Sequence, residues 1–134
     1  MEWTQNTPEY GDMIRVKVKF YHHYGIFIDE KNVIQFGLPD NGNTPPDEIQ
    51  VMSTDIQTFS NGEFVETAKY DRNEKKKLRP SSEIVKIALS RLGERGYNIL
   101  NNNCEHFATE CVFGERHSFL DDVRSKIRKQ LNIE

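Results

Sequence analysis

The chain of 134 residues lacks most features that mark a specialised class of protein. It has two cysteines, too few for a disulfide framework, and a chain of this length can bury a core without such crosslinks. No apolar stretch approaches the ~18 residues that a membrane-spanning helix needs. The first ten residues contain Glu2 and Glu9 and no apolar run, so we expect no secretory signal peptide. These absences favour a cytoplasmic protein with a single domain over residues 1–134.

An excess of positive charge is also absent. Lys and Arg number 18 and Asp and Glu number 21, giving a net charge of −3, whereas nucleic-acid-binding domains are usually basic. We therefore expect no nucleic-acid partner. One local basic run lies between Lys69 and Arg79, interrupted by acidic residues. This run is either a solvated surface connection or a contact surface for anionic lipid headgroups.

The first half of the chain has the pattern of short antiparallel strands. Ile14, Val16 and Val18 alternate with basic residues, which predicts a strand with one buried face. Residues 20–28 are aromatic and β-branched and predict a second strand. A turn at 29–32 would join it to a third strand at 33–36, making a hairpin. Further strands are predicted at 49–52 and 64–67, separated by a loop at 38–47 and a turn region at 55–62.

The second half has the pattern of helices. A helix over 81–92 would begin at a serine cap and carry an apolar stripe. A second helix, over 104–112, follows three asparagines and ends at Gly114. A third, over 119–131, is amphipathic and either packs on the domain or lies on a membrane surface. Strands followed by helices indicate an α+β fold, with a small antiparallel sheet packed against helices. The first stripe comprises Ile84, Val85, Ala88, Leu89 and Leu92, and the last comprises Leu120, Val123, Ile127 and Leu131.

Cys104 is the first candidate for a chemical role. The preceding asparagines are good N-caps, so Cys104 falls in the first turn of its helix. Backbone N–H groups there can stabilise a thiolate or an oxyanion. The alternative is a small buried core residue, which is our interpretation of Cys111. Seven residues of helix place the two cysteines roughly 10 Å apart, too far for a disulfide, and free thiols suit a reducing compartment.

A thiol nucleophile usually has a base beside it. His22 and His23 are neighbours on a predicted strand, so they point to opposite faces and only one of them can face Cys104. His106 points away from Cys104 on the helix, as a surface or capping residue, and His117 lies in a polar loop. Closely spaced metal-ligand pairs are absent. We therefore expect no metal and no other cofactor.

Three segments resemble one known family. The segment NNNCEHFATECVFGE at 101–115 is similar to the signature of the lecithin:retinol acyltransferase-like family, a branch of the NlpC/P60 thiol-enzyme superfamily. Residues 11–36 resemble the family's histidine box, in which His23 is followed by an aromatic, a small residue and an isoleucine. Residues 81–100 resemble the helix before the cysteine. Together these matches cover about half of the chain, in the family's order.

The resemblance implies a permuted papain-like fold and an acyl-enzyme thioester mechanism. In this mechanism His23 takes the proton of Cys104, and the sulfur attacks an ester or amide carbonyl. Family members act on phospholipid acyl chains, which implies an acyl-ester or phospholipid substrate and possible peripheral contact with a membrane. Tyr97 matches a tyrosine of the family motif. It either assists at the oxyanion or the thiol, or only packs the link between two helices.

One position departs from the family pattern. Vertebrate-type members carry a second histidine where this chain has Gln35. Because His23 and Gln35 lie on paired strands of one hairpin, the glutamine carbonyl can accept the imidazole N–H and fix its tautomer. Glutamine adds no charge, however, so it stabilises an imidazolium less than a charged partner would.

Two rival functions remain open. An NlpC/P60-type amidase or peptidase would use the same nucleophile but present a polar groove instead of an apolar channel. A non-catalytic binding module would keep the fold and use the cleft for a partner. The joint presence of Cys104, His23 and Gln35 favours catalysis. The sequence does not specify the acyl acceptor or the oligomeric state.

Overall fold

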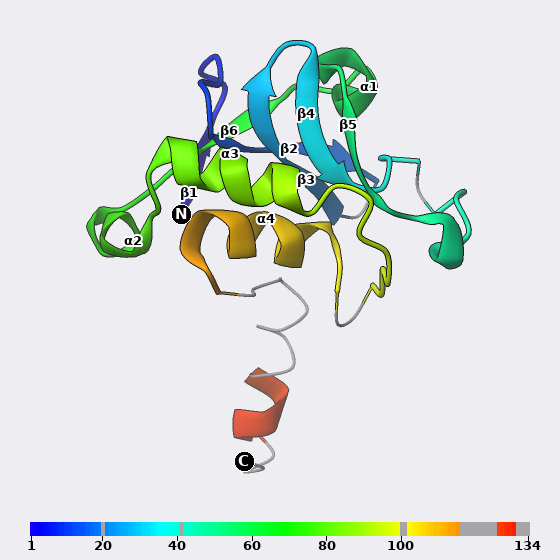
Figure 1. The fold of residues 1–134 in the computed structure, drawn as a ribbon. Helices are drawn as coiled ribbons and strands as arrows, with labels where there is room; N and C mark the ends of the chain where they lie inside the picture. The colour runs from blue at the N-terminus through cyan, green and yellow to red at the C-terminus, as the bar shows by residue number, and fades with distance from the viewer. Residues whose placement is uncertain (20, 41, 100–101, 116–125, 131–134) are drawn as a thin grey trace.

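The computed structural model describes residues 1–19, 21–40, 42–99, 102–115 and 126–130 (Figure 1). The fold is α+β, with a six-stranded antiparallel sheet in the order β1-β6-β2-β3-β4-β5. The strands are β1 (Glu2–Thr4), β2 (Met13–Val18), β3 (Tyr21–Asp29), β4 (Asn32–Phe36), β5 (Val51–Thr54) and β6 (Glu66–Lys69). The helices are a short 3-10 helix η1 (Pro46–Glu48), α1 (Ile56–Ser60), α2 (Arg72–Lys77), α3 (Ser81–Ser90) and α4 (Cys104–Phe113).

The predicted meander forms the centre of the sheet. The register pairs Val16 with His23 between β2 and β3, and Gly25 with Gln35 between β3 and β4. Ile14, Val16 and Val18 are buried as the alternation predicted, while Lys17 is exposed. The hairpin of β3 and β4 thus brings the histidine segment and Gln35 onto neighbouring strands.

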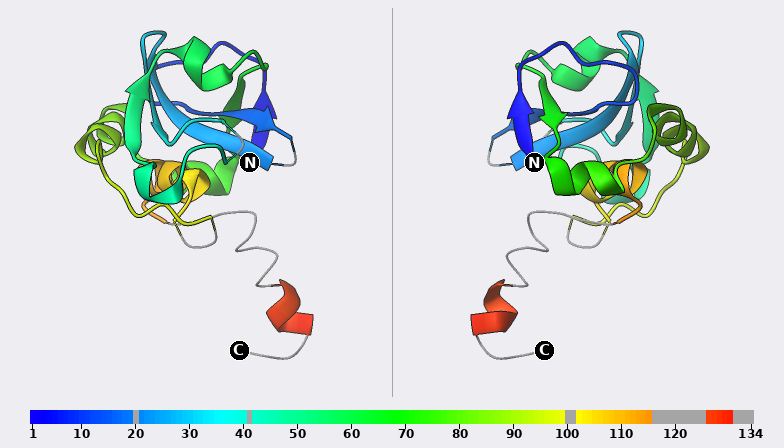
Figure 2. Two further views of the ribbon diagram at one scale, coloured as in Figure 1. Left: turned by 90° about the vertical axis from the view of Figure 1, so that its right-hand side faces the viewer. Right: turned by 90° about the vertical axis from the view of Figure 1, so that its left-hand side faces the viewer.

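Each face of the sheet carries its own apolar core. Helices α3 and α4 cover one face, where Ile26, Phe36 and Phe107 are buried. Helix α1 covers the other face, where Phe59 packs on residues of β2, β3 and β4. Figure 2 shows α1 and α4 on opposite sides of the sheet. A small antiparallel sheet packed against helices is therefore confirmed.

Helix α3 confirms the prediction in part. Ile84, Val85 and Ala88 are buried as expected. The predicted serine cap is wrong, because Pro80 is the N-cap residue and makes no side-chain capping bond. Leu89 and Leu92 are exposed, at 45% and 44%. Leu92 lies beyond the last helical residue, Ser90, so the apolar stripe is shorter than the periodicity predicted.

Several short elements differ from the predictions. The expected connection at 69–79 contains helix α2, which begins at a capping box formed by Asp71 and Glu74. The turn region at 55–62 contains α1, capped by Asp55. Strand β1 was not predicted and pairs with β6. Strands β5 and β6 each begin two residues later than expected. Short polar elements have too little apolar periodicity for prediction from pattern.

The predicted helix over 119–131 lies mostly outside the described residues, as does His117. Only residues 126–130 are described there, and they are helical and exposed. Within the described ranges, no helix combines the length and the apolar composition that crossing a bilayer requires.

Candidate active site

Cys104 opens helix α4, as the sequence predicted. The side-chain oxygen of the N-cap residue Asn103 accepts hydrogen bonds from the N–H groups of Glu105 and His106, each at 3.0 Å. In return, the Nδ1 atom of His106 accepts from the N–H of Asn103 at 3.1 Å. His106 therefore caps the helix, as one of the two expectations held, but it is buried and not on the surface. This reciprocal cap fixes the turn that carries the thiol.

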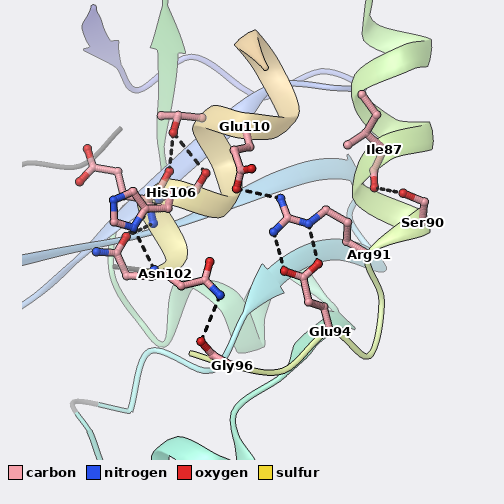
Figure 3. Close-up of polar contacts among 11 residues, drawn as sticks. Ile87, Ser90, Arg91, Glu94, Gly96, Asn102, His106 and Glu110 are labelled. Carbon is pink, nitrogen blue, oxygen red and sulfur yellow. Dashed lines mark hydrogen bonds and ion pairs between the residues drawn. The ribbon is translucent and has the colours of Figure 1, made fainter. Parts of the chain in front are cut away.

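Arg91 fixes the other side of α4. Its guanidinium donates to Glu94 at 2.7 Å and to Glu110 at 3.3 Å, as Figure 3 shows. The same group lies over the ring of Phe107, 5.0 Å from its centroid. Before α4, the side chain of Asn102 donates to the carbonyl of Gly96 at 3.1 Å. These contacts tie the start and the middle of α4 to the end of α3 and to the link that follows it.

A large groove runs past Cys104. Its volume is about 1540 Å³, and both Cys104 and His23 line it. Both side chains are nevertheless almost fully buried, at 5% and 3% exposure. The groove is lined by apolar and aromatic side chains, among them Trp3, Met13, Tyr24, Phe36, Leu38, Ile49, Tyr97, Ile99 and Phe113, and by polar or charged ones that include Arg15, Asp40, Asn98 and Glu105.

The sheet has an open edge at this groove. Pairing of β3 with β4 begins only at Gly25, so residues 21–24 pair with β2 alone. The backbone N–H of Tyr24 acts on the Cys104 thiol and lowers its pKa. Strand β4 stops because Gly37 turns the chain away with φ of +85°, in the left-handed region, where a Cβ would lie 2.8 Å from Ile49 Cγ2.

Electrostatics keep Cys104 protonated at rest. Burial raises the pKa of the Cys104 thiol to about 11, although the N–H groups of Tyr24, Glu105 and Cys104 itself act in the opposite direction. The N–H groups at the helix start thus favour the thiolate, as expected, but they do not offset the effect of burial on the Cys104 pKa. Removal from water outweighs the three donors.

His23 is neutral at rest for the same reason. Burial lowers the pKa of His23 to about 4, opposed by its hydrogen bond to Gln35 and by the negative charge of Asp40. The Nε2 atom of His23 lies 2.7 Å from Oε1 of Gln35. The ring also packs against Phe59, with centroids 5.4 Å apart. The structure thus holds a neutral imidazole in one orientation on the groove wall.

Tyr97 lies on the same groove. Its ring packs edge-on against Phe36, with centroids 5.2 Å apart. Burial raises the pKa of Tyr97, and negative charge on Cys104 raises it further. The phenol is therefore neutral and able to donate a hydrogen bond, and its ring also packs, so the geometry accommodates both expectations.

The structure therefore brings some of the predicted site residues to the same groove. Cys104, His23 and Tyr97 line one groove, and Gln35 binds His23. His22 also lines this groove, and its Nε2 atom lies 3.8 Å from a carboxylate oxygen of Glu66. Cys111 is buried in the core and free, as predicted.

Sequence reasoning missed two contributors to the site. Asp40 lies in the loop after β4, which composition identified only as a loop, and Tyr24 acts through its backbone, which no sequence pattern reveals. Among the described residues, no cluster of three His, Cys, Asp or Glu side chains is arranged to hold a metal ion.

Comparisons with known proteins identify related sequences. The family model described as lecithin retinol acyltransferase matches residues 6–117. The chain is similar to lecithin retinol acyltransferase of Mus musculus, with 30% identity over 90% of this chain and 63% of that protein. The Bos taurus protein is 28% identical over 92% of this chain and 64% of its own length.

A second group of relatives is shorter. Phospholipase A and acyltransferase 3 of Homo sapiens is 29% identical over 90% of this chain and 78% of that protein. The chain thus spans less than two thirds of the length of the lecithin retinol acyltransferases that it matches. Because the family model matches residues 6–117, which is most of the chain, the chain belongs to the lecithin retinol acyltransferase family.

Proposed function

We propose that this protein is a thiol acyltransferase or acyl hydrolase, with Cys104 as nucleophile, His23 as base and Gln35 as the group that orients the base. The observation that carries the proposal is one groove lined by a thiol at a helix N-terminus and by an imidazole whose Nε2 atom is bound to an amide oxygen. The family's members include acyltransferases and a phospholipase A by name. The proposed arrangement is the permuted papain-like one, in a single domain over 1–134.

The neutral resting pair suggests how the reaction would begin. Because the pKa of Cys104 is raised to about 11 and that of His23 is lowered to about 4, an ion pair is unfavourable before substrate binds. The thiol proton would pass to Nδ1 of His23 in the same step in which the sulfur attacks the acyl carbonyl. The carbonyl oxygen would gain the charge, stabilised by backbone N–H groups beside the sulfur and by the Tyr97 hydroxyl.

The remaining steps balance through the same histidine. As the ester C–O bond breaks, the imidazolium returns its proton to the leaving alcohol, and a thioester on Cys104 remains. Water or an alcohol or amine then loses a proton to His23 and attacks the thioester. The product acid, ester or amide leaves, and the thiol is regenerated.

The groove favours an acyl chain over a peptide. Most of the surface along the groove is apolar, although charged residues such as Arg15 and Asp40 also line it, and unpaired polar groups of a peptide backbone are unfavourable against apolar surface. We therefore prefer a phospholipid or other acyl ester to an amidase or peptidase substrate. Tyr21, Leu38 and Ile99 line the groove and are exposed at 42%, 39% and 64%. These exposed apolar side chains support peripheral contact with a lipid surface. A cytoplasmic location stays a prediction.

Intact-protein mass spectrometry tests the proposal. The protein is incubated with phosphatidylcholine vesicles and, separately, with peptide amides, and the reaction is quenched in acid. We expect one added acyl mass from the vesicles, mapped to Cys104, removed by neutral hydroxylamine, and absent in Cys104→Ala and His23→Ala. The control Cys111→Ala should acylate normally. Acylation from peptide substrates alone would favour the amidase, and vesicle binding without any acylation would favour the binding module.

A further inference from the structure

The hydrogen-bonded chain from His23 continues beyond Gln35. The Nε2 atom of Gln35 lies 2.7 Å from the hydroxyl oxygen of Thr54, on the neighbouring strand β5. That hydroxyl donates in turn to the carbonyl oxygen of Asp55 at 3.1 Å. Gln35 is completely buried, so its amide has no water to exchange these partners with. The series therefore has four members, from the imidazole to a backbone carbonyl.

We propose that Thr54 is a positioning residue that sets the direction of this series and thereby selects the tautomer of His23 that can take the thiol proton. The inference rests on the proposed function, because it concerns the same base. It assigns a role to a side chain on β5 that does not line the groove.

The argument depends on which groups can donate. A hydroxyl has a single proton, and a backbone carbonyl can only accept. Because Thr54 donates to the carbonyl of Asp55, its oxygen must accept from Gln35, so the glutamine turns its NH₂ toward Thr54. The glutamine oxygen then faces His23 and can only accept, which places the imidazole proton on Nε2. Nδ1 keeps its lone pair and is available to a thiol.

The reverse direction would disable the base. If Thr54 donated to the glutamine oxygen, the NH₂ group would face Nε2 of His23 and require an unprotonated nitrogen there. The neutral imidazole would then carry its proton on Nδ1, which could not accept another. A glutamine amide has nearly the same shape in both orientations, so Gln35 does not choose between them by itself. The orientation of the Gln35 amide is instead set by Thr54, whose hydroxyl donates to the carbonyl of Asp55.

The acceptor at that end is rigidly held. Asp55 is the N-cap of α1, and its carboxylate accepts from the N–H of Thr58 at 2.7 Å. Its carbonyl also accepts from the N–H of Phe59 at 3.1 Å. The ring of Phe59 packs on His23, so one short helix both supplies the terminal acceptor and supports the imidazole. The carbonyl cannot leave the series without disturbing the start of α1.

Nitrogen NMR of the full chain tests the inference. With ¹⁵N-labelled histidine at neutral pH, the protonated and unprotonated ring nitrogens have well-separated shifts, so the tautomer of His23 is read without any activity assay. Wild type is compared with Thr54→Val, which is isosteric but has no hydroxyl, and with Thr54→Ser, which retains it. Ser53→Ala is the matched control, because it removes an exposed hydroxyl one residue earlier on the same strand. The rate of Cys104 acylation from phosphatidylcholine vesicles is measured on the same four proteins.

We expect Nε2–H in wild type, Thr54→Ser and Ser53→Ala, and a mixture of tautomers in Thr54→Val. Acylation should fall about tenfold in Thr54→Val, as for loss of one buried hydrogen bond, and stay within about twofold in the other two. Nδ1–H in wild type, or wild-type tautomer and rate in Thr54→Val, would overturn the inference. Absence of acylation in wild type would instead overturn the proposed function, and the nitrogen shifts would still decide the role of Thr54.

Discussion

Helix α4 carries two buried free cysteines whose surroundings differ in kind. Cys104 and Cys111 are exposed by only 5% and 0%, and burial raises the pKa of these thiols to about 11 and about 12. Around Cys104, the opposing influences are backbone N–H groups at the edge of a groove. Around Cys111, the main opposing influence is the charge of Arg91, and the sulfur lies in the apolar core. Burial and pKa therefore do not distinguish the nucleophile, whereas donors and access to the groove do.

The largest expected effect comes from removing each sulfur in turn. Cys104→Ala should lower acyl transfer by about 10³-fold or more, because no thioester can form. Cys111→Ala should leave the rate within about twofold and lower the free energy of unfolding by about 1 kcal/mol, since it opens a small cavity in the core. Steady-state rates and urea denaturation measure the two effects. Equal losses of activity in both variants would contradict the distinction.

Lowering the pH should destabilise the folded protein, because it protonates His23. The folded-state pKa of His23, about 4, lies below its ordinary value of 6.5. The unfolded chain therefore binds the proton first, and stability is lost as the pH falls from 6.5 through 4. The loss should reach about 3 kcal/mol. Urea denaturation across this range measures it. The change in the free energy of unfolding with pH should be smaller in His23→Gln and should persist in His22→Gln. An unchanged pH dependence in His23→Gln would contradict the assignment.

A negative charge at position 35 should increase the difference in reactivity between Cys104 and Cys111. In Gln35→Glu, a carboxylate would lie beside Nε2 of His23 and raise the pKa of the imidazole by about one to three units. A protonated imidazole would in turn favour the thiolate of Cys104, so its alkylation should shift to lower pH while that of Cys111 should not. Peptide mapping after brief alkylation at several pH values measures both sites in one sample. Gln57→Glu, on the exposed side of α1, should shift neither.

The smallest effect is expected at Tyr97. Tyr97→Phe keeps the edge-on contact with Phe36 and removes only the hydroxyl, so the acylation rate should fall about threefold to tenfold, as for one neutral hydrogen bond. The change should appear in kcat and leave KM unaltered if the hydroxyl acts on the oxyanion. A rise in KM with constant kcat would assign Tyr97 to binding alone. The alkylation of Cys111 serves as the unaffected reference.

The sequence was informative where local rules are strong. Period-two alternation located β2, aromatic and β-branched composition located the hairpin of β3 and β4, and the asparagines before Cys104 located the start of α4. Because the hairpin places Gln35 beside the histidine segment, its contact with His23 also followed from sequence. Which of His22 and His23 is hydrogen-bonded to Gln35 did not follow from the strand pattern alone, and both histidines line the groove.

The remaining features depend on tertiary structure. Burial raises the pKa of Cys104 against the effect of the N–H groups, and no local pattern reports how deeply a helix N-terminus is covered. Thr54 lies 19 residues from Gln35, and a single threonine in a short strand carries no signal of what it will bind. Likewise, α2 is a polar helix whose existence depends on its capping box more than on an apolar stripe.

The surroundings of the thiol depend on where the pairing of β3 with β4 ends, just before Gly37. Had the pairing of β3 with β4 continued by one more pair, Tyr24 would have lain opposite Phe36, and its N–H would have been available to the sheet instead of to the thiol. Replacing Gly37 with any larger residue should thus disturb the reaction without altering a reacting group, because its Cβ would meet Ile49. A fold can therefore lose this chemistry through a change in where a sheet ends, and a variant screen limited to ionisable side chains would overlook it.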